Sequence, residues 1–236
     1  MSDVYILKII EFPKHIEYNQ LKMVSIERKN KISKYRFIQD SYRSFMAAAL
    51  ARYAICKSTE YCNEELVFDV SEYGKPYLKH PSIKKVYFNF SHSGNYVVCA
   101  VDDNNCGIDV ESNKNYSMDI ASHAFYHEEV SYLENLKNTK EAAQYFTFLW
   151  TMKEAYIKAL GIGLSKALSS FYISKTENGI SLIDFENENN IFDVYESIDI
   201  DEEYTVSFVG NSKAKYHYIT NINLIDYIKD WNACHN

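Results

Sequence analysis

The sequence lacks any long hydrophobic run. None of its 236 residues belong to a stretch that approaches about eighteen uncharged apolar residues, which a membrane-spanning helix would need. The first residues, MSDVYILKIIEF, also lack the basic start, the apolar run and the small-residue cleavage site of a secretory signal. We therefore expect a cytoplasmic protein that does not contact a membrane.

Paired cysteines are also missing. The five cysteines are odd in number and include no C-x-x-C pair, so neither a disulfide framework nor a zinc ribbon is indicated. In a reducing compartment such residues serve most simply as small buried hydrophobic side chains.

Positive charge is in short supply. The chain has 25 Lys and Arg against 32 Asp and Glu, which gives a formal net charge of -7. This balance argues against sequence-independent binding of nucleic acid by the whole surface. Any anionic ligand must instead be bound by a local basic cluster.

A long Pro, Gly or Ser linker is absent as well, and the polar stretch VDDNNCG is the one junction near the middle. We place a boundary there, between residues 1–104 and 105–236. Hydrophobic residues make up 47% of the chain and charged residues 24%, which is ordinary for a folded globular protein.

The hydrophobic pattern predicts the same plan in each half. Helical spacing predicts helices over residues 30–58, 128–136 and 141–160, with a short helix closing the chain. Alternation predicts strands over 4–10, 65–70, 84–90, 96–101, 106–111, 169–174, 180–186, 191–198 and 204–210, and one more strand before the closing helix within residues 215–231. The expected fold class is α+β, a pseudo-twofold pair of similar halves, each a long helix on a small antiparallel sheet.

The stretch CGIDVES places two carboxylates on one face of a predicted strand that continues the sheet of the first half. Ile108 and Val110 point one way, and Asp109 and Glu111 point the other. Like charges side by side are unfavourable unless water or a cation neutralises them. The stretch by itself fits either a solvated outer face or a cation site.

The predicted helix FLWTMKEAYIKAL carries Trp150, Glu154 and Lys158 at i, i+4 and i+8, on one side. A surface Glu–Lys pair of this kind is worth only about 0.3–0.5 kcal/mol. Because a large aromatic ring shares that side with both charges, the side also fits the wall of a cleft.

Three further segments fit either a structural or a functional role. SHSGN is a plausible hairpin corner, and its Ser91, His92 and Ser93 could also surround a phosphate. EYGKP fits a turn in which Gly74 takes a positive φ. Several basic residues between Arg28 and Arg43 form either a solvated helix face or a polyanion site.

Taken in order, E-Y-G-K-P, F-N-x-S-H-S, G-I-D-V-E, W-x-x-K-E-A-x-x-K and G-x-G-L resemble the Sfp-type 4′-phosphopantetheinyl transferases. These enzymes activate the carrier proteins of peptide and polyketide synthetases. The resemblance extends from Arg28 to about residue 172 and implies an active site at the interface of two similar halves.

Carried over by position, the resemblance implies a Mg²⁺ ion, with Mn²⁺ as a substitute, bound by Asp109, Glu111 and Glu154. It implies that coenzyme A is the second ligand. The implied contacts with coenzyme A are Arg28, Lys31, Arg43 and Ser44 at the 3′-phosphate and adenosine, Gly74, Lys75 and Pro76 under the adenine, Ser91, His92 and Lys158 at the phosphates, and Trp150 near the pantetheine arm.

The implied reaction is attack by a carrier-protein serine on the β-phosphate of coenzyme A, which releases 3′,5′-ADP. We expect the catalytic residues to be Glu154, as base and metal ligand, with Lys158, His92 and Glu129; one register away, Glu128 is the alternative to Glu129. A non-catalytic binding protein and a metal-dependent pyrophosphate hydrolase are the alternative functions.

The resemblance places carrier docking after the acidic strand, where Tyr116, Met118 and Ile120 either form a hydrophobic patch or cap the local core. We expect a monomer, because one chain contains both halves. Neither a nucleic acid nor a membrane is an expected partner.

Overall fold

The computed structural model of the chain describes residues 1–17, 23–81, 85–177, 179–186 and 191–233, and it has the predicted α+β class. The helices are α2 (Ile26–Ile32), α3 (Ile38–Ser58), α4 (Met118–Ala124), α5 (His127–Asn135), α6 (Thr139–Leu160) and α7 (Asn221–Ala233). The strands are β1 (Ser2–Lys8), β2 (Val67–Val70), β3 (Pro76–His80), β4 (Tyr87–Ser93), β5 (Tyr96–Asp102), β6 (Gly107–Ser112), β7 (Phe171–Thr176), β8 (Gly179–Asp184), β9 (Val194–Ile200), β10 (Tyr204–Gly210) and β11 (Ala214–Thr220).

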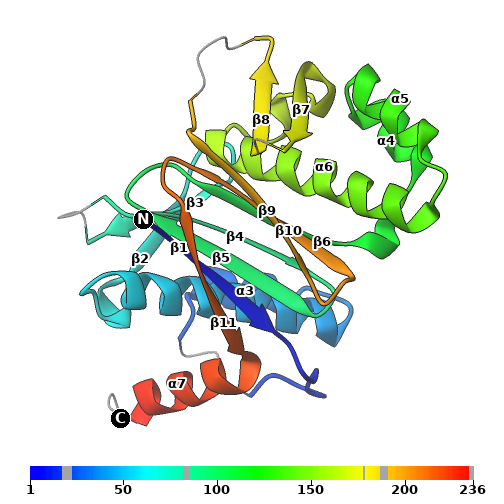
Figure 1. The fold of residues 1–236 in the computed structure, drawn as a ribbon. Coiled ribbons are helices and arrows are strands. Elements are labelled where there is room, and N and C mark those ends of the chain that lie inside the picture. Colours follow the sequence, from blue (N-terminus) through cyan, green and yellow to red (C-terminus); the bar gives the residue numbers. More distant parts are fainter. Residues whose placement is uncertain (18–22, 82–84, 178, 187–190, 234–236) are drawn as a thin grey trace.

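Two sheets pack face to face between two long helices. The first sheet has the strand order β11-β1-β5-β4 and the second has the order β6-β10-β9. Figure 1 shows α3 on the outer side of the first sheet and α6 on the outer side of the second. This arrangement encloses one core under each helix and a third core between the sheets.

Alternation along the strands decides which core each side chain enters. On β1, Val4 and Ile6 face the second sheet, whereas Tyr5 and Leu7 face α3. On β6, Ile108 and Val110 enter the core between the sheets. Asp109 and Glu111 are therefore directed toward the side of the sheet that α6 covers, as the sequence pattern predicts.

The expected continuation of the first sheet by residues 106–111 is wrong. β6 pairs with β10 in antiparallel register and begins the second sheet. It nevertheless runs beside β4, where the Ile108 amide donates to Asn89 Oδ1 at 3.0 Å. The two sheets thus meet along β4 and β6 through side chains, and this junction places residues of both halves next to each other.

The expected helix over residues 30–58 is two helices in the structure. α2 ends at Ile32, and α3 begins at Ile38. Ser41 of α3 donates its hydroxyl to the Ile32 carbonyl at 3.1 Å, which satisfies an acceptor at the end of α2.

The end of the chain returns to the first sheet. β11 pairs in parallel with β1, and α7 follows it and packs near α3. The last strand and helix of the chain therefore lie against elements of residues 1–104, and the division at residue 105 stays a prediction. The parallel pair also departs from the all-antiparallel pairing that the sequence analysis expects.

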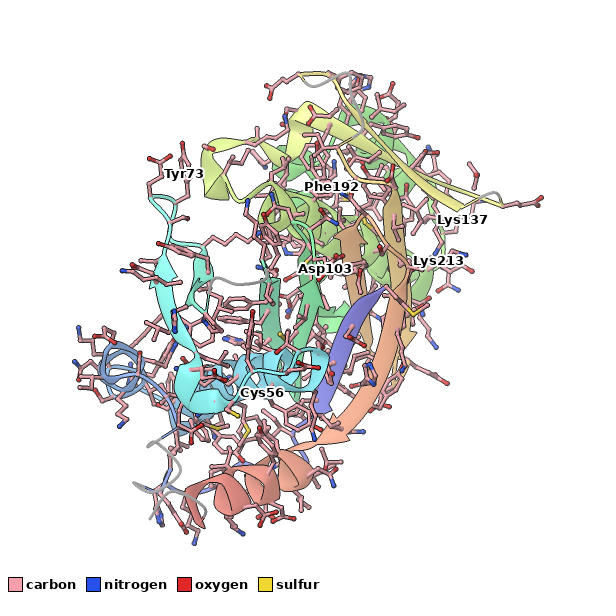
Figure 2. All side chains as sticks on the ribbon, turned by 90° about the vertical axis from the view of Figure 1, so that its left-hand side faces the viewer. Cys56, Tyr73, Asp103, Lys137, Phe192 and Lys213 are labelled. Carbon is pink, nitrogen blue, oxygen red and sulfur yellow. The ribbon has the colours of Figure 1, made fainter. Side chains whose placement is uncertain are left out.

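Two small hairpins complete the fold. β2 pairs with β3, and β7 pairs with β8, each in antiparallel register. Figure 2 shows Tyr73 at the tip of the β2–β3 hairpin. This tip approaches the segment after α6, because a Cβ placed on Gly163 would lie 3.6 Å from the Tyr73 Cβ. Within the described parts of the chain, no helix combines the length and apolar character that crossing a bilayer requires.

Gly107 allows β6 to approach α6 closely. A Cβ at this position would lie 1.9 Å from the Ala155 carbonyl oxygen and 2.5 Å from the Ala159 nitrogen, both of which are main-chain atoms. Only a residue without a side chain permits this contact. The contact sets the distance between the strand that carries Asp109 and the helix that carries Glu154.

We expect Gly107→Ala to destabilise the protein by about 3 kcal/mol, because main-chain atoms on α6 cannot move aside as a side chain would. The measurement is the free energy of unfolding in urea. Gly179→Ala is the control: it meets open space and should cost about 1 kcal/mol, from its φ of +122° alone. Equal losses for the two variants would contradict the close approach.

Candidate active site

Serines of β4 face carboxylates of β6 at the junction of the sheets. Ser91 Oγ donates to Asp109 Oδ1 at 2.6 Å, and Ser93 Oγ donates to Glu111 Oε2 at 2.7 Å. Both pairs follow the two-residue period of the strands. Asn115 Nδ2 also donates to Glu111, at 3.0 Å.

Lys158 joins α6 to this cluster. Its ammonium lies 2.5 Å from Asp109 Oδ1 and donates to Ser91 Oγ at 3.2 Å. The side chain of Asp109 is only 5% exposed, so this ion pair is shielded from water on the side of the carboxylate. A partly buried lysine held in this way can interact strongly with an anion.

Glu154 faces the same region from one helical turn before Lys158. Burial raises the pKa of Glu154, and the charges of Asp109 and Glu111 raise it further, although Lys158 acts in the opposite direction. Burial and the charge of Asp109 also raise the pKa of Glu111, while hydrogen bonds from Ser93 and Asn115 oppose the change. The three acids predicted as metal ligands are therefore close enough to sense one another's charges.

A pocket of about 270 Å³ opens beside Glu154 and Lys158. Its walls come from both halves of the chain. It is lined by Tyr73, Gly74, Lys75, Pro76, Asn89 and Phe90 from the first half, and by Glu154, Ile157, Lys158, Gly161 and Gly163 from the second. The structure thus brings the predicted adenine loop and the predicted helical pair into one cavity.

Lys75 crosses from one half to the other. Its ammonium donates to the Lys158 carbonyl at 2.5 Å and to the Cys106 carbonyl at 3.3 Å. Burial lowers the pKa of Lys75. Because the Lys158 carbonyl belongs to the last turn of α6, the lysine satisfies an acceptor at the negative end of the helix dipole.

Two arginines from α2 and α3 lie next to β4 and its turn. The guanidinium of Arg28 lies 5.7 Å from the ring of Phe90, which lines the pocket. Arg43 donates to the Gly94 carbonyl at 3.1 Å and pairs with Asp40 at 2.6 Å. Loss of contact with water, caused by the surrounding protein, lowers the pKa of His92, and the positive charge of Arg43 lowers it further. His92 is therefore neutral at pH 7.

Of the seven predicted ligand contacts that do not line the pocket, Arg28, Arg43, Ser91 and His92 lie on or next to β4 and its turn, and three lie elsewhere. Lys31 is exposed on α2. Ser44 is buried on α3, and its hydroxyl has no hydrogen-bond partner among the described residues. Trp150 stacks on Phe146 and packs near Phe125, so it belongs to the core under α6. None of the three lines the pocket.

Glu129, one of the expected catalytic residues, lies in the protein interior and not in the lining of the pocket. Its side chain is fully buried and pairs with Lys153 at 2.9 Å. It also accepts the amides of Tyr126 at 2.9 Å and Ile173 at 2.7 Å. With its oxygens occupied in this way, Glu129 does not reach the pocket. The neighbouring Glu128 is exposed beside His127.

Lys153 completes the buried pair from the side of α6. Besides Glu129, its ammonium donates to the carbonyls of Leu168 at 2.9 Å and Phe171 at 2.7 Å. Burial lowers its pKa to about 8, although Glu129 opposes the change. Lys153 and Glu154 are neighbours about 100° apart around the helix, so one anchors α6 while the other faces the pocket.

Sequence reasoning missed Asn115 and Lys153, and it placed Ser93 in a turn instead of in a strand. Treating SHSGN as a turn hid the strand alternation that directs Ser91 and Ser93 toward β6, because β4 continues to Ser93 and only Gly94 and Asn95 form the turn. That alternation was the available signal. Lys153 does occur in the quoted motif W-x-x-K-E-A-x-x-K, but nothing along the chain indicates that its ammonium is buried, since most lysines are solvated.

The acidic side chains at this site bear on whether it can hold a metal ion. Among the described residues, no three His, Cys, Asp or Glu side chains converge closely enough to hold a metal ion as they stand. Yet the buried Asp109 Oδ2 has no hydrogen-bond partner there, which is a costly state for a carboxylate oxygen. An all-oxygen donor set with one unsatisfied oxygen suits a hard dication such as Mg²⁺.

The expected docking residues are only partly exposed. Tyr116 donates its hydroxyl to Met118 Sδ at 3.7 Å and packs against Phe146, so both residues cover the core under α6. Ile120, at 45% exposure, is the one that offers apolar surface.

A larger hollow of about 440 Å³ lies among Lys8, Tyr96, Asp199, Asp201 and Tyr218. It contains none of the predicted site residues. The smaller pocket is therefore the candidate active site.

Comparison with known families identifies the class of enzyme. The family described as 4′-phosphopantetheinyl transferase, N-terminal, matches residues 13–104. The 4′-phosphopantetheinyl transferase superfamily matches residues 105–209. A solved holo-(acyl-carrier-protein) synthase from Bacillus anthracis, in complex with CoA (3′,5′-ADP), overlaps 44% of this chain and 92% of its own at a TM-score of 0.38 and 18% identity, too distant to carry an argument.

Sequence identity to individual enzymes identifies the family within this class. A 4′-phosphopantetheinyl transferase of Bacillus subtilis is 35% identical over 81% of this chain and 84% of its own length. The transferase Sfp of B. subtilis strain 168 is 35% identical over 67% of this chain and 70% of its own length. The chain belongs to the Sfp-type 4′-phosphopantetheinyl transferase family, as its motifs predict.

We expect Lys153→Met to destabilise the protein by about 3–5 kcal/mol, because it leaves the Glu129 carboxylate buried without its counter-charge. Adding Glu129→Gln should recover roughly 1–3 kcal/mol, since no lone charge then stays buried. Urea unfolding measures both changes.

The control is Lys140→Met, which removes an exposed ion pair with Glu202 and should cost less than about 1 kcal/mol. Strictly additive losses in the double variant would show that Glu129 and Lys153 are not coupled.

Proposed function

We propose that the protein transfers the 4′-phosphopantetheine arm of coenzyme A to a serine of an apo carrier protein, a peptidyl or acyl carrier domain, and releases 3′,5′-ADP. The observation that carries this proposal is the cluster of Asp109, Glu154 and Lys158 at the mouth of a pocket built from both halves. Acids for a metal and a lysine for phosphate oxygens are what phosphoryl transfer requires.

In this proposal the pocket holds coenzyme A and basic side chains hold its phosphates. The segment Gly74, Lys75 and Pro76 supports the adenine, and Arg28 and Arg43 are the proposed cations for the 3′-phosphate. Lys31 and Ser44 are also proposed as contacts of the 3′-phosphate, although neither residue lines the pocket. A phosphate oxygen competes with Asp109 for the ammonium of Lys158.

Bond changes at the β-phosphorus define the reaction. The carrier serine oxygen forms a bond to this phosphorus, and the bond to the oxygen shared with the α-phosphate breaks. 3′,5′-ADP leaves with that oxygen. Glu154 accepts the serine proton, because its raised pKa makes it a stronger base than an ordinary carboxylate. Lys158 stabilises the charge on the phosphate oxygens, and neutral His92 can donate a hydrogen bond to them.

Mg²⁺, or Mn²⁺ in its place, would be held by Asp109, Glu111 and Glu154 and would neutralise charge on the diphosphate. The orphaned Asp109 Oδ2 and the mutual repulsion of the acids support this assignment. The site is complete within one chain, so the proposed working unit is a monomer, and the carrier docks near Ile120.

The deciding experiment combines the protein with coenzyme A, Mg²⁺ and either an apo peptidyl or an apo acyl carrier domain, followed by intact mass spectrometry. A gain of one phosphopantetheine mass on the carrier supports transfer. Formation of 3′,5′-ADP with an unmodified carrier would instead indicate a hydrolase, and binding of coenzyme A without turnover would indicate a non-catalytic protein.

We expect Glu154→Gln to lower the rate of transfer by about a hundredfold or more, because the amide cannot accept the serine proton. Coenzyme A should still bind with an affinity close to that of the unaltered protein, as measured by calorimetry. The matched control is Glu141→Gln, an exposed acid in the first turn of the same helix. Near-normal turnover by Glu154→Gln would remove Glu154 from its role as the base.

We expect Mg²⁺ to raise the melting temperature of the protein bound to coenzyme A, since a ligand that binds only the folded state stabilises it. Glu111→Gln should lose most of this shift while keeping its contacts with Ser93 and Asn115. Differential scanning calorimetry with and without a chelator measures the shift. An identical shift in both proteins would place the metal elsewhere.

A further inference from the structure

The segment after α6 forms one wall of the pocket and contains a single 3-10 turn, Gly163–Ser165. Gly161 caps the helix in the left-handed region, with φ at 74°, and Gly163 has φ at 60°. Both glycines line the pocket. Two residues that adopt this conformation freely give the segment several alternative paths, so its observed path needs an anchor.

Lys166 is the buried anchor of this segment. Among its described side chains, that of Lys166 alone is buried, at 6% exposure. The ammonium pairs with Asp184 of β8 at 2.9 Å and with Glu186 at 2.5 Å. Two further hydrogen bonds of the described residues in this segment are local: the Gly161 amide donates to the Ile157 carbonyl at 3.0 Å, and the Ser165 hydroxyl donates to the Ile162 carbonyl at 2.7 Å.

Asp184 links this anchor back to α6. Its Oδ2 accepts the hydroxyl of Tyr156 at 2.7 Å, and its side chain is only 4% exposed. Tyr156 is buried on α6 between Glu154 and Lys158 in sequence. A chain of contacts from Lys166 through Asp184 to Tyr156 therefore ties the pocket wall to the helix that carries the proposed catalytic residues.

The network stays charged at neutral pH. Burial opposes the charge of Lys166, but hydrogen bonds to Glu186 and Asp184 outweigh it and raise the pKa of Lys166. Burial likewise opposes the charge of Asp184, yet the hydrogen bonds from Tyr156 and Lys166 lower its pKa. A buried, fully paired network of this kind holds its members in one geometry.

We propose that Lys166 and Asp184 are positioning residues that hold Gly161 and Gly163 in place as the wall of the coenzyme A pocket. This inference rests on the proposed function, since it takes coenzyme A as the ligand of that pocket. Neither residue touches the pocket itself. Their effect on binding passes through the main chain of the segment between Gly161 and Lys166.

We expect Lys166→Met to raise the dissociation constant of coenzyme A about tenfold, because a displaced wall no longer contacts the ligand. The kcat at saturating coenzyme A and the KM for the carrier should stay within about twofold, since only ground-state binding is lost. Lys166→Arg, which keeps the charge, should restore most of the affinity. The control is Glu186→Gln, which removes a partner that is 67% exposed and should change affinity less than about twofold.

The outcomes separate this inference from the proposed function. Failure of the unaltered protein to bind coenzyme A would overturn the proposed function. If the unaltered protein binds coenzyme A and a folded Lys166→Met variant binds it equally tightly, the positioning role is overturned. A fall in the kcat of the variant as large as its loss of affinity would overturn it too.

If Lys166→Met does not fold, Asp184→Asn decides, because it keeps a hydrogen bond to Tyr156 but removes the charge; unchanged affinity would overturn the proposal. Amide hydrogen exchange of the unaltered protein supplies an independent measurement. Slow exchange across residues 162–166 is expected, and exchange as fast as in an unanchored loop would overturn the proposal.

Discussion

Three carboxylates lie near the junction of β4, β6 and α6 without converging on one point, and the burial of their charges is the constraint on which the arrangement of the site depends. After burial itself, Asp109 and Glu111 raise the pKa of Glu154. The chain offsets these charges with Lys158 beside Asp109 and with hydroxyl and amide donors at Glu111. Such a cluster is retained in a fold when it has chemistry to perform, because an apolar junction would be easier to bury.

The surroundings of this cluster depend on lysines that bind protein groups instead of water. Lys75 joins the two halves through main-chain carbonyls, Lys153 ties α6 to the strand that follows it, and Lys166 anchors the pocket wall. A long aliphatic side chain lets each ammonium reach partners from a distant element. Through these three contacts, α6 is held on several sides while Glu154 and Lys158 stay directed at the pocket.

Much of the fold could be predicted from local patterns. The strand over residues 204–210 has the predicted bounds, and the helix predicted over 141–160 begins two residues earlier, at Thr139. The predictions that failed concern pairing and turns. Residues 106–111 alternate as expected, but hydrogen bonding with a strand about one hundred residues later in the chain, Tyr204–Gly210, placed them in the other sheet. Local patterns also do not define the first residue of a turn, because polar residues such as Ser91 and Ser93 occur both in strands and in turns.

The sequence by itself determined the family, the class of fold and the facing of Asp109, Glu111, Glu154 and Lys158, because motifs and the periodicities of strand and helix depend only on neighbours along the chain. Only the tertiary structure decided that Glu129 is a buried partner of Lys153 and that Lys75 binds carbonyls across the two halves. Those roles depend on which distant groups share a low-dielectric interior, and spacing along the chain carries no information about that.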